Sequence, residues 1–198
     1  MITRKAIATL TICTLSVLSI PNVLNLNKVE AQPVTDYREE TPNYRDANCR
    51  NFVPGTYLST ATQTNSASGQ PSLYREIITF TADGNLIAND STAGGVPGSS
   101  EPAEQPFGSI QGTWKCTGNN EIVAKVLNFG FPSGSLLGYI ALTEYSLTFD
   151  PTTGTVNGDL TYNLFDLDSN PLDQNTQALP GGPYAFTYSG EKLTVNED

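Results

Sequence analysis

Polar and apolar residues alternate with a period of two along much of the chain after residue 52. For example, Ile110, Gly112, Trp114 and Cys116 alternate with polar residues. Successive side chains of a β-strand point to opposite faces of a sheet, so this pattern is typical of a strand with one buried face. No segment of this region shows a long helical period, and the pattern therefore predicts an all-β domain.

Turn-forming residues separate these alternating segments at short intervals, as at Asp83-Gly84 and at Asp150 to Gly154. The last turn expected, Ser189-Gly190-Glu191, would join a closing hairpin. Two longer polar segments, 92–107 and 166–183, are expected to be surface loops. The strands expected from this punctuation are 55–62, 73–81, 85–91, 110–117, 121–131, 139–149, 155–165, 184–188 and 192–195.

Hairpins that follow one another, each with one apolar face, must either close into a barrel or stack as a sandwich. The simple order of the hairpins favours a single antiparallel up-and-down barrel of about eight or nine strands. A jelly-roll or immunoglobulin-like sandwich is the alternative.

The hairpin around Gly84 also predicts which residues face each other. Its register places Phe80 opposite Leu86 and Glu76 opposite Asp90. Two acids on an otherwise apolar face repel each other and raise the pKa of one of them, so Glu76 and Asp90 are the candidate acid/base pair. The alternative is that both acids lie in water at the rim of the barrel.

The N-terminus has the pattern of a secretory signal. Arg4 and Lys5 precede an apolar stretch, 6–20, that is short for a membrane span. Val29-Glu30-Ala31 fits a cleavage site. We therefore expect a signal peptide at 1–31, a flexible arm at 32–51, a barrel domain at 52–198, and a secreted or periplasmic protein without a membrane span after cleavage. The alternative is an uncut N-terminal membrane anchor.

Charge and composition exclude several functions. The chain carries a net charge of −10, and residues 1–31 hold three cations and one anion, so cleavage would leave −12. Such a surface disfavours binding to nucleic acid and to anionic membranes. Histidine is absent, which excludes Ser-His-Asp and Cys-His catalysis and removes the commonest zinc ligand. We expect neither a cofactor nor a metal.

Two of the three cysteines remain after the predicted cleavage, because Cys13 lies in the signal segment. An even pair in an exported chain indicates one disulfide, Cys49–Cys116. Two buried free thiols are the alternative.

One acidic segment has part of the spacing of a calcium loop. Asp166, Asp168 and Asn170 supply oxygens at the right intervals, but Pro171 and Gln177 stand where such a loop needs Gly and Glu. We therefore expect an acidic turn.

Gly55-Thr-Tyr-Leu58, Ile78 to Asn85 and Gly112-Thr-Trp-Lys-Cys116 together resemble small exported bacterial proteins of lipocalin-like or allene-oxide-cyclase-like barrel type. The resemblance implies a calycin-like barrel whose interior is apolar.

The abundant aromatic residues of the expected barrel could line a ligand cavity, with Trp114, Tyr139 and Tyr162 as candidates, or simply fill the core. We expect a protein that binds a small apolar molecule. The alternatives are a structural or interaction protein of the cell envelope or matrix, and a cyclase or isomerase that uses Glu76 and Asp90.

Overall fold

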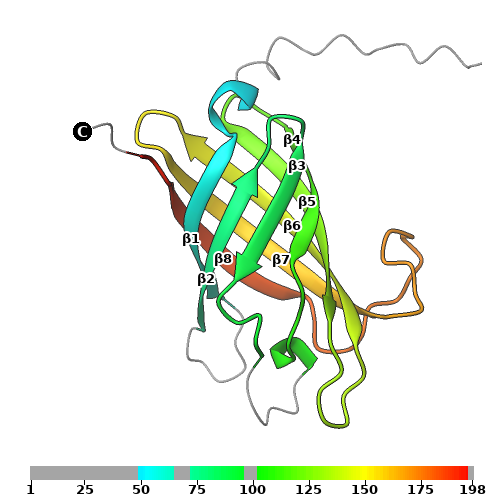
Figure 1. The fold of residues 1–198 in the computed structure, drawn as a ribbon. Helices are drawn as coiled ribbons and strands as arrows, with labels where there is room; N and C mark the ends of the chain where they lie inside the picture. Colours follow the sequence, from blue (N-terminus) through cyan, green and yellow to red (C-terminus); the bar gives the residue numbers. More distant parts are fainter. Residues whose placement is uncertain (1–48, 65–71, 96–101, 196–198) are drawn as a thin grey trace, which may run out of the picture. The chain divides into compact units, whose positions relative to one another are not determined.

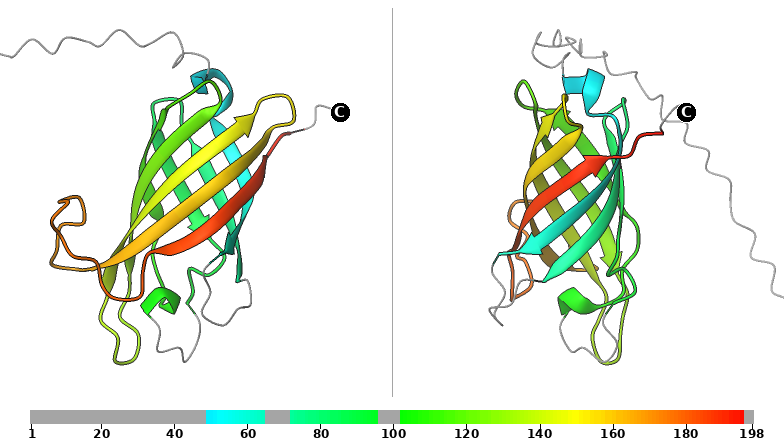
Figure 2. Two further views of the ribbon diagram at one scale, coloured as in Figure 1. Left: turned by 180° about the vertical axis from the view of Figure 1, so that it is seen from behind. Right: turned by 90° about the vertical axis from the view of Figure 1, so that its left-hand side faces the viewer.

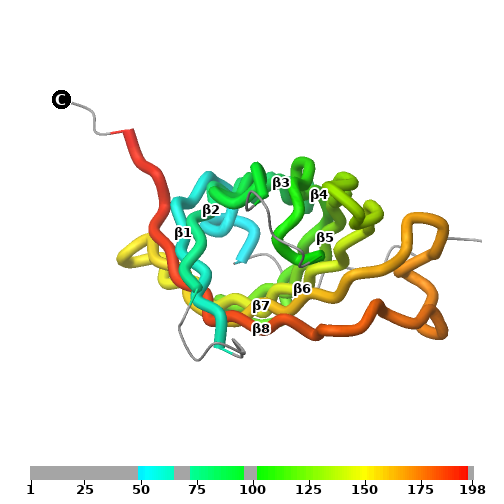
Figure 3. The backbone as a smooth tube through the Cα atoms, turned by 90° about the horizontal axis from the view of Figure 1, so that it is seen from below, coloured from blue at the N-terminus to red at the C-terminus, as the bar shows by residue number. Residues whose placement is uncertain are grey.

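The structure is a computed structural model that describes residues 49–64, 72–95 and 102–195. The predicted signal segment, its cleavage site and most of the predicted arm therefore lie outside the described residues. Within these residues, eight antiparallel strands form a closed barrel in which each strand pairs with the next and the last pairs with the first (Figure 1). Seen along its axis, the backbone forms a ring in chain order (Figure 3). The predicted up-and-down barrel is confirmed, and the sandwich is excluded.

The strands agree with the predicted segments to within a few residues at most ends. They are β1 (Gly55–Gln63), β2 (Leu73–Phe80), β3 (Asn85–Asp90), β4 (Ile110–Cys116), β5 (Glu121–Gly130), β6 (Tyr139–Asp150), β7 (Thr155–Asp166) and β8 (Tyr184–Lys192). Burial alternates along most of them, as the sequence pattern requires. Most buried positions of the eight strands face one interior; Ile140 of β6 and Phe165 of β7, which pair with each other, are buried on the outer face.

The predicted closing hairpin is wrong, because β8 continues through Gly190 instead of turning there. Gly190 pairs with Ser59 of β1 and with Val156 of β7, so it lies where β8 closes the barrel between two neighbours. A Cβ atom at this position would collide with the Ser59 side chain. Gly190 thus allows two strands to approach closely. From the local sequence alone, such a glycine is mistaken for a turn residue.

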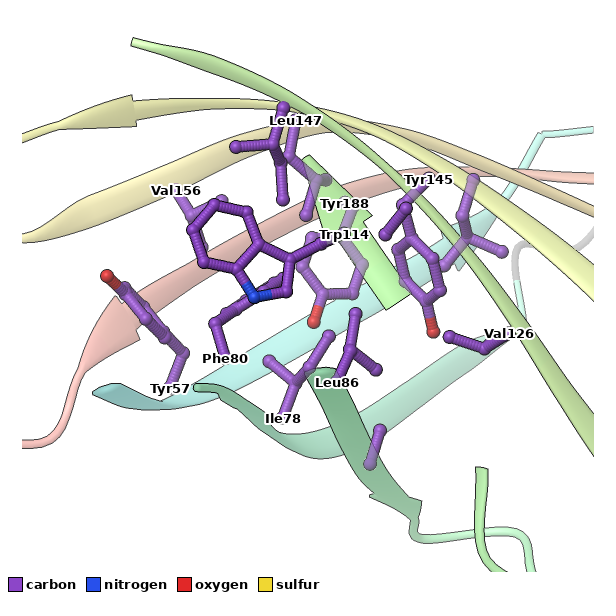
Figure 4. Packing of buried hydrophobic residues seen from close by; sticks show 14 of the residues in the cluster. Tyr57, Ile78, Phe80, Leu86, Trp114, Val126, Tyr145, Leu147, Val156 and Tyr188 are labelled. Atoms are coloured by element: carbon purple, nitrogen blue, oxygen red, sulfur yellow. The ribbon is translucent and has the colours of Figure 1, made fainter. Parts of the chain in front are cut away.

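Aromatic side chains fill the barrel at the end formed by the tight hairpin turns. Phe80 packs edge to face against Tyr57, Trp114 and Phe149, with ring centroids 5.5 to 5.9 Å apart. Figure 4 shows Tyr57, Phe80 and Trp114 close together in the core. The indole Nε1 of Trp114 donates to the carbonyl of Thr81 at 3.0 Å. This half of the interior is solid core.

A helical turn at 49–52 covers the same end of the barrel (Figure 2). Cys49 and Val53 are fully buried, and the Tyr57 hydroxyl donates to the carbonyl of Val53 at 2.9 Å. Cys49 forms the predicted disulfide with Cys116 of β4. The last residues assigned to a flexible arm by the sequence are therefore held against the core.

Longer connections lie at the opposite end. The described part of the expected loop 92–107 is not irregular throughout. It contains the 3₁₀ turn η1 (Pro102–Glu104), and Phe107 forms a β-bridge with Gly130. Phe131 donates its backbone N–H to the carbonyl of Pro106 at 2.7 Å, which ties this connection to the end of β5.

Candidate ligand-binding site

A pocket of about 110 Å³ occupies the interior of the barrel at the end with the long connections. Its wall comes from positions on all eight strands and from the segments 92–95 and 103–107. The aromatic core around Phe80 closes the other end, so the pocket has its floor in mid-barrel and its mouth among the connections. The residues that line it are Ala61, Tyr74, Glu76, Asp90, Thr92, Gly95, Ala103, Glu104, Phe107, Ile110, Asn128, Tyr139, Ala141, Thr143, Tyr145, Leu160, Tyr162, Leu164 and Phe186.

Glu76 and Asp90 line this pocket together. They are direct partners across β2 and β3, which is the register that the hairpin around Gly84 predicts. Glu76 is only 4% exposed and lies at an inward position between Tyr74 and Ile78. Asp90 is half-buried, and its Oδ1 accepts the backbone N–H of Thr92 at 2.6 Å. The alternative, that both acids lie in water at the rim of the barrel, does not fit the burial of Glu76.

Two tyrosines hold the Glu76 carboxylate. Tyr145 of β6 donates its hydroxyl to Oε1 at 2.9 Å, and Tyr188 of β8 donates to Oε2 at 2.6 Å. The two rings meet edge to face with centroids 5.7 Å apart, and both lie inside the barrel (Figure 4). Three strands that are far apart in the sequence thus fix one carboxyl group at the pocket floor.

Burial raises the pKa of Glu76 from 4.5 to about 7. The charged form loses its hydration inside the barrel, and this cost exceeds the stabilisation that the two tyrosine hydroxyls give to the carboxylate. The negative charge of Asp90 adds to the rise. Burial likewise raises the pKa of Tyr145 and of Tyr188, so both phenols stay protonated as donors near neutral pH.

The structure separates the three aromatic candidates. Tyr139 and Tyr162 line the pocket, whereas Trp114 belongs to the solid core at the other end. Tyr162 stacks on Tyr184 and Phe186, with centroids 4.7 and 5.7 Å away. Burial raises the pKa of Tyr139 to about 12, and that of Tyr162 is raised as well, so these two phenols remain uncharged near neutral pH.

Several lining residues were not singled out from the sequence, among them the polar side chains of Tyr74, Asn128 and Thr143. Asn128 is 7% exposed and follows Ile122, Ala124 and Val126 on the inward face of β5. A polar residue in the inward register of an apolar strand is the signal that could have identified it. Together these residues add an amide and hydroxyl groups to the pocket.

The acidic segment after β7 forms turns. Ser169 donates its hydroxyl to the carbonyl of Asp166 at 2.7 Å, and the side-chain oxygen of Asn170 accepts the backbone N–H of Leu172. Among the described residues, no group of three or more His, Cys, Asp or Glu side chains is placed to hold a metal ion. Within the same residues, no helix is long and apolar enough to cross a membrane.

No protein-family model, curated protein or solved structure shows a significant match to this chain. The chemistry of the pocket therefore rests on its own geometry. An apolar, aromatic cavity with one buried carboxyl group can enclose a small organic molecule and hold one of its polar groups.

Proposed function

We propose that the protein binds a small, largely apolar molecule in the pocket of the barrel. The observation that carries the proposal is the cavity itself, with aromatic and aliphatic walls and a few convergent polar groups. Small-molecule sites in proteins have this composition, and the mouths of β-barrels are one of their usual places. An eight-stranded barrel is also just wide enough inside to hold one small ligand.

The volume of the pocket limits the size of the ligand. An engineered cavity of about 150 Å³ in another protein holds one benzene molecule, and the pocket here is about 110 Å³. A single ring fits if its substituent extends toward the mouth, which the partly exposed Ala103 and Phe107 border. A ligand with several fused rings would have to displace lining side chains.

Binding of toluene and of benzyl alcohol tests the proposal. We expect saturable NMR shifts confined to pocket residues and a dissociation constant of about 0.1–1 mM, given the free energy that a ligand of about seven or eight heavy atoms can supply. Ala141→Phe, which fills the pocket from β6, should weaken binding at least about tenfold. Thr148→Phe, on the exposed face of the same strand, should leave it unchanged.

A protein that gives no saturable shifts with either probe would overturn the proposal. That result would favour the alternative of a structural or interaction protein. If Ala141→Phe does not fold, the milder Ala141→Leu gives the same comparison with less added volume.

A second candidate function is a cyclase or isomerase that moves a proton inside the pocket. A carboxyl group with a pKa of about 7 is half ionised at neutral pH and suits general acid–base chemistry. Glu76 would take a proton from a carbon beside a ligand carbonyl and return it at another position. Deuterium exchange into cyclohexanone in D₂O tests this: the wild type should speed exchange and Glu76→Gln should not. Equal rates in both would exclude the enzyme.

We also propose that the barrel works outside the cytoplasm. The Cys49–Cys116 disulfide suits an oxidising compartment, and the pattern of residues 1–31 is typical of a secretory signal. Mass spectrometry of the exported protein should find a mature chain that begins near Gln32. A chain that retains residues 1–31 would contradict the predicted cleavage of a signal peptide and would favour an uncut membrane anchor.

A further inference from the structure

The carboxyl groups of Glu76 and Asp90 line the pocket without a lysine or arginine beside them among the described lining residues. The two acids face each other at the pocket wall. A buried carboxylate is costly unless an opposite charge lies near it. Tyr145 and Tyr188 supply hydrogen bonds to Glu76 but no positive charge. A positively charged ligand would supply the positive charge that the pocket-lining side chains do not provide.

The connections around the mouth have the same sign of charge. The described segments 91–95, 102–109, 131–138 and 167–183 contain the acids Glu104, Asp168 and Asp173 and neither lysine nor arginine. An acidic entrance raises the local concentration of cations and repels anions.

The basic residues that the structure describes lie elsewhere. Lys192 donates to the carbonyl of Phe52 at 2.8 Å, at the closed end of the barrel. Lys125 forms an ion pair with Glu144 on the outer face, with 2.7 Å between Nζ and Oε1. Arg75 is exposed on the outward side of β2. None of these side chains lines the pocket.

Aromatic rings complete the site. Tyr74 meets Phe186 edge to face at 5.5 Å, and Phe186 stacks on Tyr162 at 5.7 Å, so these three rings form one wall. The electron-rich face of an aromatic ring attracts an ammonium group as well as apolar carbon. The aromatic wall thus suits a molecule that carries both an ammonium group and an apolar carbon skeleton.

We propose that the ligand is an organic amine cation: an ammonium group on an apolar ring or short chain, with the ammonium group between Glu76 and Asp90 and the carbon skeleton against the aromatic wall. This inference rests on the proposed ligand-binding function and specifies its ligand class. Neutral and anionic molecules of the same shape should bind less well.

Proton linkage gives the site a characteristic pH dependence. The groups around Glu76 are Asp90 on β3, Tyr145 on β6 and Tyr188 on β8, together with the uncharged Ser59 opposite it on β1. A cation favours the ionised form of Glu76, so its affinity should fall about tenfold from pH 8 to pH 6 as the carboxyl group, whose pKa is about 7, takes up a proton. A neutral ligand should show little change.

Benzylamine, benzyl alcohol and benzoate test the inference, because they share one ring and differ in charge. Titration at pH 8 should show benzylamine binding at least about tenfold more tightly than benzyl alcohol and benzoate binding most weakly. Glu76→Gln should reduce the advantage of benzylamine over benzyl alcohol about tenfold. Asp159→Asn, an acid-to-amide change on the outer face of β7, is the matched control and should change neither.

The outcomes separate the two proposals. If benzyl alcohol binds in the pocket and benzylamine binds no better, the amine inference is wrong and the binding function stands. If none of the three molecules binds, the binding function itself fails. Should Glu76→Gln not fold, Asp90→Asn removes the other carboxylate of the site and should also weaken benzylamine selectively.

Discussion

At the scale of single residues, the buried carboxyl group of Glu76 links stability to pH. Its pKa is about 7 in the folded barrel and 4.5 as a free side chain. Between these values the folded protein binds more protons than the unfolded chain does, so stability falls as the pH rises. The contribution of Glu76 is fully present below pH 4.5 and is lost as the pH passes through about 7. The exposed acids Asp83 and Asp150 have lowered pKa values, so their contributions change only below their ordinary range.

Glu76→Gln should therefore flatten the pH dependence of stability. The difference between the two pKa values corresponds to about 3 kcal/mol of unfolding free energy between acid and alkaline pH. Urea unfolding followed from pH 4.5 to pH 8 should show this loss in the wild type and most of it removed in the variant. Asp159→Asn should keep the wild-type slope. If the stability of the wild type does not fall over this pH range, the raised pKa of Glu76 is refuted.

Burial also decides how much each aromatic ring contributes to the free energy of unfolding. Phe80 is 1% exposed among three other rings, whereas Phe129 is 58% exposed on the outer face of β5. Phe80→Ala leaves a cavity in close-packed core and should lower the free energy of unfolding by about 3–5 kcal/mol. Phe129→Ala, the same change at the surface, should cost less than about 1 kcal/mol. Chemical denaturation measures both, and similar losses would contradict the packing described for the closed end.

At the scale of elements, the β2–β3 hairpin shows how far a local pattern reaches. Alternation and the turn at Gly84 fixed both its strands and its register, including the pair Glu76–Asp90. The wrong prediction at Gly190 shows the limit of such local patterns. A glycine that makes room for a neighbouring strand looks the same in the sequence as a glycine that forms a turn. Local signals cannot distinguish the two, since the collision that requires glycine comes from residues distant in sequence.

Gly112 is a second glycine that two strands require. It pairs with Leu86 of β3 and Val126 of β5, and a Cβ atom there would collide with the backbone oxygen of Lys125. Gly112→Ala should lower the free energy of unfolding by about 3 kcal/mol, the upper end of the range for overpacking, because backbone must move. Gly94→Ala meets no atom within 4 Å and should have little effect. Thermal unfolding compares the two variants, and equal midpoints would show that β4 and β5 are further apart than described.

At the scale of the molecule, one covalent bond ties the helical turn to the barrel. The Cys49–Cys116 disulfide joins residues separated by 67 positions and closes a loop through β1, β2, β3 and β4. Such a loop restricts the unfolded chain by about 4 kcal/mol on the chain-entropy account. The stabilisation from the disulfide is thus a large fraction of the net free energy of unfolding of an ordinary domain.

The double variant Cys49→Ala, Cys116→Ala should lower the free energy of unfolding by about 2–4 kcal/mol, as measured by urea denaturation. Wild-type protein kept in a strong reductant should behave like the variant. Reductant should have no effect on the variant itself. Detection of two free thiols in oxidised wild-type protein would instead support the alternative of unpaired cysteines.

The sequence by itself determined strands β1 to β7 and the pairing of Glu76 with Asp90, because period-two alternation and turn residues act over a few neighbours. It did not determine β8, which continues through the predicted turn at Gly190. It also indicated the disulfide by elimination among three cysteines. Only the tertiary structure decided which aromatic residues fill the core and which line a pocket. Trp114 and Tyr162 have the same inward register on their strands, yet they lie at opposite ends of the interior. Tyr145 and Tyr188 reach Glu76 across the closed barrel from 69 and 112 positions away in the sequence, and no local pattern encodes such contacts.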